Sequence, residues 1–489
     1  MKTTKFDVAI VGAGTAGLSA YRQVRKFTDR IALIDGGPLG TTCARVGCMP
    51  SKLLIAPAEA RHRLKALPEF GIRCDSAVVD GAAVMRRVRA ERDRFVGFVL
   101  QSMNTFEQRH LVRAFAQFED PFTLRLSSAD ANEQPQSDLP LIHADRIILA
   151  TGSRPRIPQE LEAAGDRLIV SDDVFEWQDL AQSVAVFGAG AIGLELGQAL
   201  HMLGVRVRVF GRAGSLAGIS DPAVRDYAVK VIGADLPLSL DIGNVRIERD
   251  GECVVVQYEA ADSKLRTERF DYLLAATGRR PNVERLALEN SGLALSDDGV
   301  PLFDSLTMRA ADSHIFIAGD ANADRTVLHE AADEGRRAGE NAARYPNVFK
   351  RTRRTPLGIV FSDPQIAFAG CRHAQLVADK IDFCVGEVSF EDQGRARVLL
   401  RNQGLLRVYA EQGTGRLLGS EMIGPQNEHL AHLLAWAIQM QLSVAELLEM
   451  PFYHPVIEEG LRTALRDLLR ALDMGPEPPA HCIDCGPGA

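Results

Sequence analysis

The sequence predicts an α/β protein in which two similar strand–helix–strand units, one inserted into the other, precede a C-terminal α+β domain. Two observations carry this prediction. A glycine-rich strand–helix–strand pattern occurs twice, and near residue 350 it gives way to short runs that alternate between apolar and polar residues. A chain of 489 residues that is 46% hydrophobic can bury several cores, and at roughly 150 residues each it has room for about three domains.

The first unit begins with the run FDVAIVGAGTAGLSA, an apolar strand followed by three glycines and a helical pattern. Gly12 permits a tight turn, Gly14 lets the backbone approach a pyrophosphate, and Gly17 lets the helix pack closely on the strand. A second strand, IALID, ends at Asp35, 18 residues beyond Gly17, where an acid can bind a ribose 2′-hydroxyl. This combination predicts a Rossmann-like dinucleotide-binding domain rather than a flexible loop.

The same pattern returns in SVAVFGAGAIGLELGQALHMLGVRVRVFGR, with Gly188, Gly190 and Gly193 as the three glycines. The chain therefore binds two dinucleotides or contains a duplicated fold. The position that holds an acid in the first unit is Gly211 here, and Arg212 follows it. An arginine without a neighbouring carboxylate suits a 2′-phosphate, so NADPH is favoured over NADH. An ordinary solvated loop residue is the alternative interpretation of Arg212.

Two shorter repeats bracket the second unit. RIILATGSRPRIP contains Thr151 and Gly152, and YLLAATGRRPNV contains Gly278. Each is an apolar strand, an Ala-Thr-Gly step and a basic turn with proline, as expected where a chain crosses between two nucleotide domains. Residues 153–278 are therefore predicted to form an inserted domain. After it, the run HIFIAGD returns the chain to the first domain and places Asp320 near the first cofactor.

Cys43 and Cys48 lie in the run GTTCARVGCMPSK. They could bind a metal, form a structural disulfide or act as a redox pair. A zinc site would need further ligands at short spacing, and the neighbouring sequence has none. In a reducing compartment a close pair is more often catalytic or metal-binding than structural. The helical run that follows would favour thiolate character at its N-terminus.

The order of these motifs, together with a late HPVIEEG, resembles the FAD-dependent pyridine-nucleotide disulfide oxidoreductases, most of all dihydrolipoamide dehydrogenase. The resemblance covers nearly the whole chain. It implies FAD in the first domain with Asp320 at the ribityl chain, a nicotinamide cofactor in the second, and a redox-active Cys43–Cys48 disulfide. It further implies that Cys48 faces the flavin and that Cys43 exchanges with substrate. Lys52 and Glu195 match family positions that form an ion pair near the flavin.

The run PFYHPVIEEGL contains His454 and, five residues later, Glu459. The resemblance implies that this histidine is the acid–base group of thiol–disulfide exchange and that the glutamate orients it. In the family such a histidine reaches the disulfide of the other subunit, which implies a homodimer with composite active sites. The alternating runs FSDPQIAFAG and GLLRVYA and the apolar helical run EHLAHLLAWAIQM fit a dimerisation domain.

The predicted organisation has four parts. They are an FAD-binding domain at 1–152 and 279–349, an NAD(P)H-binding domain at 153–278, a dimerisation domain at 350–473 and a flexible tail at 474–489. The tail presents Cys482 and Cys485 as Cys-x-x-Cys after a proline-rich stretch. Mercuric reductases and large thioredoxin reductases also carry a C-terminal cysteine pair, which favours an accessory redox role. An inert tail and adventitious metal binding with His481 are the alternatives.

Two residues beside the cysteines depart from the family pattern, which commonly has glycine where this chain has Thr41 and asparagine where it has Arg45. A cation at Arg45 could stabilise a thiolate or select an acidic disulfide substrate; exposure without function is the alternative.

The sequence thus predicts a flavoprotein that passes electrons between NAD(P)H, FAD, the cysteine pair and a dithiol or disulfide substrate. Dihydrolipoamide/lipoamide, free or on a lipoyl-bearing protein, is the favoured substrate. One alternative is an NADPH-dependent reductase of another small-molecule or protein disulfide that works through the tail cysteines. An alternative of another class is a non-catalytic flavoprotein scaffold or metal-binding subunit. No resident metal is expected.

Charge and hydropathy narrow the partners. The net charge is −8 and the chain has no long basic run, which argues against nucleic acid. The N-terminus lacks the apolar core of a signal peptide, and no apolar stretch is long enough to span a membrane. A cytoplasmic location is expected.

Overall fold

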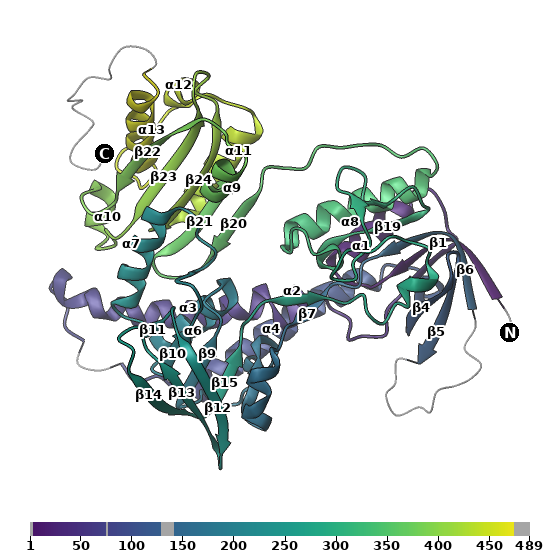
Figure 1. Cartoon of the computed structure of the whole chain (residues 1–489), viewed down its shortest axis with the longest axis horizontal. Coiled ribbons are helices and arrows are strands. Elements are labelled where there is room, and N and C mark those ends of the chain that lie inside the picture. Colours follow the sequence, from purple (N-terminus) through teal and green to yellow (C-terminus); the bar gives the residue numbers. More distant parts are fainter. Residues whose placement is uncertain (1–2, 75–76, 129–140, 474–489) are drawn as a thin grey trace. The chain divides into compact units, whose positions relative to one another are not determined.

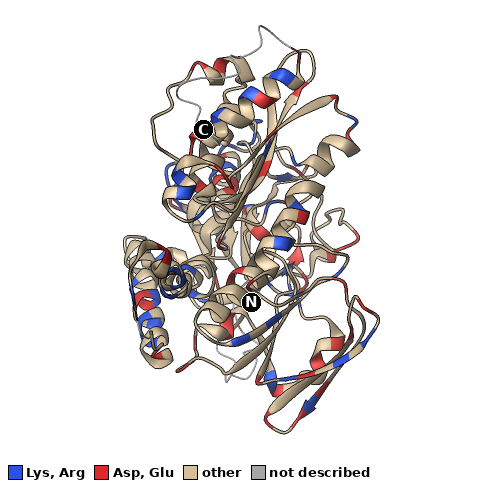
Figure 2. Ribbon diagram, turned by 90° about the vertical axis from the view of Figure 1, so that its left-hand side faces the viewer, with Lys and Arg blue, Asp and Glu red and all other residues tan. Residues whose placement is uncertain are grey.

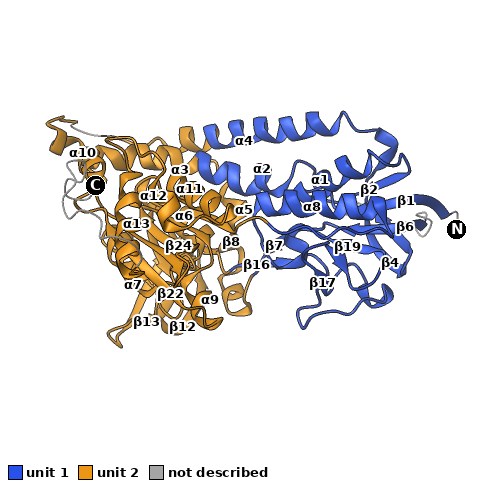
Figure 3. Ribbon diagram, turned by 90° about the horizontal axis from the view of Figure 1, so that it is seen from above, with its two compact units in different colours: residues 1–53, 87–156, 278–353 blue, residues 54–86, 157–277, 354–489 orange. Residues whose placement is uncertain are grey.

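The computed structural model describes residues 3–74, 77–128 and 141–473, which form two compact units (Figure 3). The first unit contains residues up to 53 together with 87–156 and 278–353. The second contains 54–86, 157–277 and the described residues from 354 onward. The finer division into three domains and a tail stays a prediction.

A mixed sheet that includes β1, β6 and β19 forms the centre of the first unit (Figure 1). Its main strand order is β17–β18–β19–β6–β1–β2–β3. β1 pairs in parallel with β2 and β6, and β6 pairs in parallel with β19 and antiparallel with β5 of the β4–β5 hairpin. A separate two-stranded ribbon joins β7 to β16. The strands are β1 (Thr3–Val11), β2 (Ile31–Ile34), β3 (Leu111–Val112), β4 (Ala114–Asp120), β5 (Thr123–Ser128), β6 (Leu141–Leu149), β7 (Ser153–Pro155), β16 (Arg279–Pro281), β17 (Phe303–Asp304), β18 (Arg309–Ala310) and β19 (Ile315–Ile317).

The helices of this part of the chain include the one after the first glycine motif and the two that contain the cysteines. They are α1 (Thr15–Val24), α2 (Thr42–Val46), α3 (Cys48–Arg63), α4 (Gly81–Met103) and α8 (Leu328–Arg344). β1 is apolar on both faces because both are covered: Val8 and Ile10 pack with α1 and α8, and Ala9 and Val11 pack with the β4–β5 hairpin.

The second unit contains a parallel sheet in the order β11–β10–β9–β15–β8 and, apart from it, the antiparallel sheet β12–β13–β14. Its parallel part repeats the arrangement of β1, α1 and β2, since α6 connects the neighbouring strands β9 and β10. The elements are β8 (Leu168–Val170), α5 (Ser171–Val174), β9 (Ser183–Phe187), α6 (Ala191–Met202), β10 (Arg206–Phe210), α7 (Pro222–Gly233), β11 (Leu238–Ser239), β12 (Gly243–Asp250), β13 (Cys253–Glu259), β14 (Leu265–Phe270) and β15 (Tyr272–Ala275).

The C-terminal part of the second unit is an antiparallel sheet in the order β20–β21–β24–β23–β22 (Figure 1). Alternate residues of its strands, such as Leu406, Val408 and Met422, share one core with the apolar faces of α11 and α13, so both helices cover the same face. The elements are β20 (Leu357–Val360), β21 (Gln365–Gly370), α9 (His373–Ala378), β22 (Phe383–Ser389), α10 (Gly394–Val398), β23 (Leu405–Glu411), β24 (Leu417–Gly424), α11 (Asn427–Gln439), α12 (Val444–Leu448) and α13 (Glu459–Ala471).

These sheets confirm the predicted fold class. Each of the two compact units contains a Rossmann-like α/β sheet, and the second unit also contains the antiparallel sheet and helices of the C-terminal α+β part. Basic and acidic residues are interspersed along the helices and strands (Figure 2). Across the described residues, no helix combines the length and the apolar character that crossing a membrane requires.

Asp221 joins the two parts of the second unit. Its fully buried carboxylate caps α7 by accepting the backbone N–H groups of Ala223 and Val224, and it accepts two bonds from Arg407 Nη1 at 2.8 and 2.9 Å and one from Tyr409 Oη at 2.8 Å. Burial opposes ionisation, but these donors outweigh it and hold the pKa of Asp221 below its ordinary value.

Asp221→Asn is therefore expected to lower the free energy of unfolding by about 3 kcal/mol, because Arg407 stays half-buried without this counter-charge. Because the folded pKa is depressed, the contribution of Asp221 is fully present above its ordinary pKa and is lost as the pH falls through the lowered value. Thermal midpoints measured from neutral to acid pH should converge for the variant and the parent. The exposed Asp226→Asn is the matched control, and an equal loss in that variant would contradict the prediction.

Candidate active site

The first glycine turn is closed by contacts that leave no room for a side chain. Gly12 has φ +109°, and a Cβ there would lie 2.2 Å from the carbonyl oxygen of Ala150. A Cβ on Gly17 would lie 1.8 Å from the carbonyl oxygen of Gly12. Gly14, by contrast, has open space beside it and directly precedes α1. The turn therefore leaves its outer side and the N-terminus of α1 open to a ligand.

This open side is suited to an adenine dinucleotide such as FAD. A helix N-terminus attracts phosphate. The Asp35 carboxylate is held beside the turn by the N–H groups of Ala13 at 2.6 Å and Gly37 at 2.7 Å. Thr151 Oγ1, next to Ala150, is buried and finds no hydrogen-bond partner among the described residues. A free hydroxyl, an anchored carboxylate and a helix N-terminus around one glycine turn fit the cofactor.

The second glycine turn has the same geometry. Gly188 has φ +112° and a Cβ there would lie 2.2 Å from the carbonyl oxygen of Ala276, while a Cβ on Gly193 would lie 1.9 Å from that of Gly188. Gly190 precedes α6 and has open space beside it. The second glycine turn is therefore built like the first and fits a second dinucleotide.

The two Ala-Thr-Gly runs have a function that their sequence interpretation missed. β6 pairs with β1 and β15 pairs with β9, so Ala150 and Ala276 press against the glycine turns. Gly152 and Gly278 follow with φ +71° and +101°, a conformation that glycine adopts easily. The runs are thus walls of the two dinucleotide sites as well as chain crossings. The sequence feature that could have predicted this function is the position of both runs at the ends of apolar strands.

Arg212 lies on the surface after β10, at the place that matches the residue after Asp35. Its side chain is 82% exposed, and its Nη2 is 2.7 Å from Glu160 Oε1. A Cβ on Gly211 would lie 2.9 Å from Leu240 Cδ2, so no carboxylate fits there without a shift of that side chain. A 2′-phosphate bound by Arg212 would compete with Glu160 for the guanidinium.

Asp320 lies in the short 3₁₀ turn η5 (Gly319–Asn322), which begins two residues after the last residue of β19. Its Oδ2 accepts a hydrogen bond from Ser153 Oγ at 2.6 Å, and Ser153 Oγ also accepts one from Arg279 Nε at 2.8 Å. Sequence reasoning did not single out Ser153 or Arg279. The signal was present, because each is the residue that follows an Ala-Thr-Gly run.

Cys43 and Cys48 are brought together by two consecutive helices, since Cys43 lies in α2 and Cys48 is the first residue of α3. Both cysteines are in the thiol form; Cys43 is half-buried and Cys48 is exposed. The pKa of Cys43 lies well above its ordinary range, chiefly because its thiol hydrogen-bonds to Cys48 and secondly because it is partly buried. Two thiols in contact can close to a disulfide, and in the dithiol state Cys43 keeps its proton at neutral pH.

The residues that depart from the family pattern shape this cysteine loop. Thr41 caps α2 by accepting the N–H of Ala44 at 3.3 Å, and it has φ +61° and ψ +147°, a region that costs a β-branched residue about 1–3 kcal/mol. Arg45 Nη1 lies 3.5 Å from the carbonyl oxygen of Pro38, which is a long hydrogen-bond distance.

The members of the predicted Lys52–Glu195 ion pair belong to different units. Lys52, on α3, has its Nζ 3.3 Å from Ser51 Oγ. Glu195, buried on α6, accepts the backbone N–H of Phe361 at 2.9 Å. The ion pair itself stays a prediction.

His454 and Glu459 are in contact. His454 Nδ1 lies 3.0 and 3.2 Å from the two carboxylate oxygens of Glu459. Glu459 is 2% exposed and also accepts the N–H of Val456 and Nη2 of Arg462, both at 3.1 Å. The histidine side chain is 69% exposed. A buried carboxylate thus orients the ring while its other edge faces solvent.

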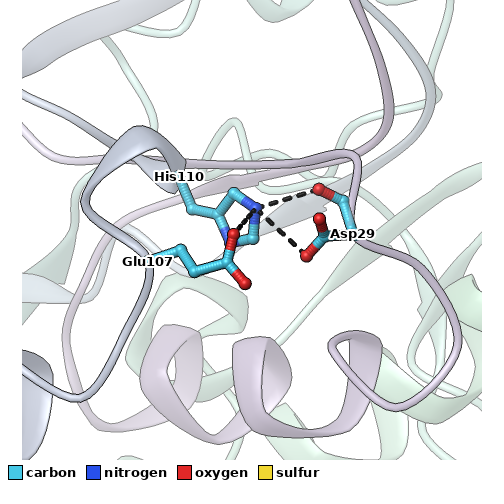
Figure 4. A group of neighbouring side chains, drawn as sticks. All are labelled: Asp29, Glu107 and His110. Carbon is cyan, nitrogen blue, oxygen red and sulfur yellow. Dashed lines mark hydrogen bonds and ion pairs between the residues drawn. The ribbon is translucent and has the colours of Figure 1, made fainter.

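One cluster has the residue types of a metal site: Asp29, Glu107 and His110 (Figure 4). Its acids are already neutralised, because Arg25 pairs with Glu107 and Arg109 pairs with both acids. The two ring nitrogens of His110 hydrogen-bond to Tyr21 Oη and to the carbonyl oxygen of Asp29. We therefore interpret it as a structural ion-pair cluster. Cys482 and Cys485 lie outside the described residues.

A model of the pyridine nucleotide-disulphide oxidoreductase family matches residues 6–337, and the model of that family's dimerisation domain matches residues 357–465. The chain belongs to this family. Its members depend on FAD and use a pyridine nucleotide, so the predicted cofactors are confirmed at that level. The matched dimerisation domain supports formation of a homodimer.

Curated relatives cover nearly the whole chain. The mercuric reductase of Shigella flexneri is 28% identical over 94% of this chain and 80% of its own length. The dihydrolipoyl dehydrogenase of Geobacillus stearothermophilus is 28% identical over 93% of this chain and 94% of its own. Among solved structures, the copper(II) complex of the HOCl-induced flavoprotein disulfide reductase RclA from Escherichia coli aligns with a TM-score of 0.78 at 21% identity, covering 94% of this chain and 99% of that one. That likeness concerns the fold. The chain is thus a flavoprotein disulfide oxidoreductase whose substrate these family members do not fix.

Proposed function

We propose that this protein transfers electrons between a nicotinamide cofactor and a dithiol/disulfide substrate through Cys43 and Cys48, and that the substrate is dihydrolipoamide/lipoamide. The observation that carries the proposal is the contact between the thiol of Cys43, on α2, and that of Cys48, at the start of α3, which suits reversible disulfide formation. Bound FAD would supply the two-electron link between NAD(P)H and the cysteine pair. The residues that would hold FAD are Gly12, Gly14, Gly17, Asp35, Thr151, Gly152 and Asp320.

In the direction of dithiol oxidation, His454 takes the proton of one substrate thiol, and the resulting thiolate attacks Cys43 of the Cys43–Cys48 disulfide. A mixed disulfide forms at Cys43, and Cys48 leaves as a thiolate. The second substrate thiol then attacks the substrate sulfur of the mixed disulfide, which closes the substrate disulfide and expels Cys43. His454 returns its proton to Cys43, and the proton of the second substrate thiol leaves through His454 to solvent. Two electrons have passed from the substrate to the cysteine pair. Glu459 keeps His454 oriented throughout.

The proposal includes a homodimer with composite sites. The outer face of α11 exposes Leu433 and Trp436, and Met440 follows the last residue of the helix; Trp436 is 64% and Met440 71% exposed. Tyr453, beside His454, is 80% exposed. These exposed apolar side chains lie on the matched dimerisation domain, which supports a partner subunit there. A cytoplasmic location belongs to the same proposal.

Comparing lipoamide turnover with and without the tail tests the substrate. We expect kcat/KM for lipoamide to stay unchanged or rise when the chain is truncated before Gly475, because a small disulfide reaches Cys43 without the tail. Poor turnover in both forms, or a collapse on truncation, would favour the second candidate. That candidate is an NADPH-dependent reductase of another disulfide that uses Cys482 and Cys485. A bound flavin that neither NADPH nor NADH reduces would instead favour a non-catalytic scaffold.

The preference for NADPH rests on Gly211 and Arg212, where the first unit has Asp35. Arg212→Ala is expected to lower kcat/KM for NADPH by about tenfold and to leave that for NADH unchanged, since only NADPH offers a phosphate for a charge-assisted bond. Steady-state rates with each cofactor measure this. Arg225→Ala, an exposed arginine on α7, is the control. An equal loss of kcat/KM with NADPH and NADH would show that Arg212 does not bind the 2′-phosphate.

A further inference from the structure

α8 packs backbone to backbone on α1, the helix that begins at the first glycine turn (Figure 1). A Cβ on Gly335 would lie 2.1 Å from the carbonyl oxygen of Ala16, and one on Gly339 would lie 2.6 Å from that of Ala20. These contacts set the position of α8 relative to α1. Any group held by α8 is therefore also placed relative to the glycine turn.

One side chain of α8 holds the turn that carries Asp320. Glu334 is 1% exposed, and its Oε2 accepts the N–H of Gly319 at 2.8 Å and Nδ2 of Asn322 at 2.7 Å. Gly319 and Asn322 are the first and last residues of η5. A single carboxylate oxygen thus spans the turn, and Asp320 lies between its two anchors.

The second oxygen of Glu334 is bound by Arg353. Arg353 Nη2 contacts Glu334 Oε1 and lies 3.0 Å from Glu330 Oε2, and its Nη1 pairs with Asp324. Burial raises the pKa of Glu334, and Arg353 opposes that rise. Three donors around one buried carboxylate favour its charged form.

We infer that Glu334 is a positioning residue for FAD: acting through Gly319 and Asn322, it sets where Asp320 meets the cofactor. The inference rests on the proposed place of Asp320 at the flavin. It adds Glu334 and Arg353 to the residues on which FAD binding depends, although neither lies in a motif that the sequence marks.

Only a carboxylate satisfies this site. Glutamine has one acceptor oxygen, so its amide NH₂ would face either Arg353 or the two donors of η5, and a donor would oppose a donor in both orientations. Glu330 offers a matched control. It is 5% exposed, and its two oxygens accept from Arg325 and Arg353, but it does not contact η5. In Glu330→Gln the amide NH₂ also faces an arginine donor and the same negative charge is removed, but η5 keeps all its contacts.

The experiment measures the FAD dissociation constant of each protein by titrating the flavin-free form and following flavin fluorescence. Glu334→Gln is expected to bind FAD about tenfold or more weakly than Glu330→Gln, as for loss of hydrogen bonds to a charged group, while the thermal midpoints of the two flavin-free variants fall alike. Equal FAD affinities in the two variants would overturn the inference.

Two further variants separate the causes of a negative result. Asp320→Asn should weaken FAD binding. If it does so and the FAD affinities of Glu334→Gln and Glu330→Gln are still equal, Glu334 has no positioning role. If Asp320→Asn leaves the FAD affinity unchanged, Asp320 does not contact the cofactor and the inference fails with it. If Glu334→Gln does not fold, Asn322→Ala replaces it, since it removes one anchor of η5 and leaves the Arg353 pairs intact. Unchanged FAD affinity in Asn322→Ala would overturn the inference.

Discussion

Replacing Cys43 with serine is expected to lower disulfide turnover by about 10³-fold or more, the loss typical of removing a covalent nucleophile. Cys43 and Cys48 are hydrogen-bonded thiols on adjacent helices, so either one without the other cannot form the disulfide that takes up an electron pair. A serine keeps the size and the hydrogen bond of the thiol, and the loss then reports chemistry rather than packing.

Steady-state turnover of lipoamide, or of the preferred disulfide once it is known, gives the magnitude. Reduction of the bound flavin by NADPH should persist in the same variant, because that step does not need the cysteine pair. Cys384→Ser is the matched control: the Cys384 thiol hydrogen-bonds to Gln412 Oε1 and belongs to the C-terminal sheet. Turnover within a few-fold of the parent in Cys43→Ser would show that electrons take another path, with the tail cysteines as the next group to test.

His454→Gln is expected to lower turnover by about 10²–10⁴-fold, the range for loss of a general acid–base group. Its ring is held by Glu459, whose two oxygens accept from the histidine, from the N–H of Val456 and from Arg462. Glu459→Gln should lower turnover by a smaller factor than His454→Gln, because the base remains but its orientation is no longer enforced.

A double variant distinguishes this role from a general loss of structure. If Glu459 acts through His454, Glu459→Gln adds little to the loss already caused by His454→Gln. Thermal midpoints measured alongside show how much of the Glu459→Gln effect comes from Arg462, which loses its buried partner. Glu458→Gln, one residue earlier, is the control. If the losses of turnover in the two single variants add up in the double variant, Glu459 does not act through His454.

Short-range patterns predicted the parts of the site that short-range contacts build. The oxygen of Gly12 blocks a side chain on Gly17 only five residues away, and His454 meets Glu459 over the same separation. Cys43 and Cys48 meet because one turn of chain joins two helices. In each case the spacing along the chain already limits the geometry to a few conformations.

Contacts between distant segments were not predictable in this way. The partner that Arg212 finds, Glu160, lies 52 residues earlier in the chain, and its competition with a 2′-phosphate follows from the fold alone. Ser153 and Arg279 surround Asp320 because two crossing strands meet as a ribbon. The periodicity of apolar residues along the chain does not predict contacts between such distant segments.

The sequence by itself indicated two dinucleotide turns and a close cysteine pair, because glycine spacing, strand and helix periodicity and residue chemistry are local properties. The family resemblance of the sequence implied the histidine with its glutamate. The tertiary structure decided how these parts are supported. It placed Ala150 and Ala276 against the glycine turns, and it set Glu334 under the Asp320 turn. The physical reason is that buried polar groups must be paired wherever the fold puts them, and the identity of each partner depends on which distant segments pack together.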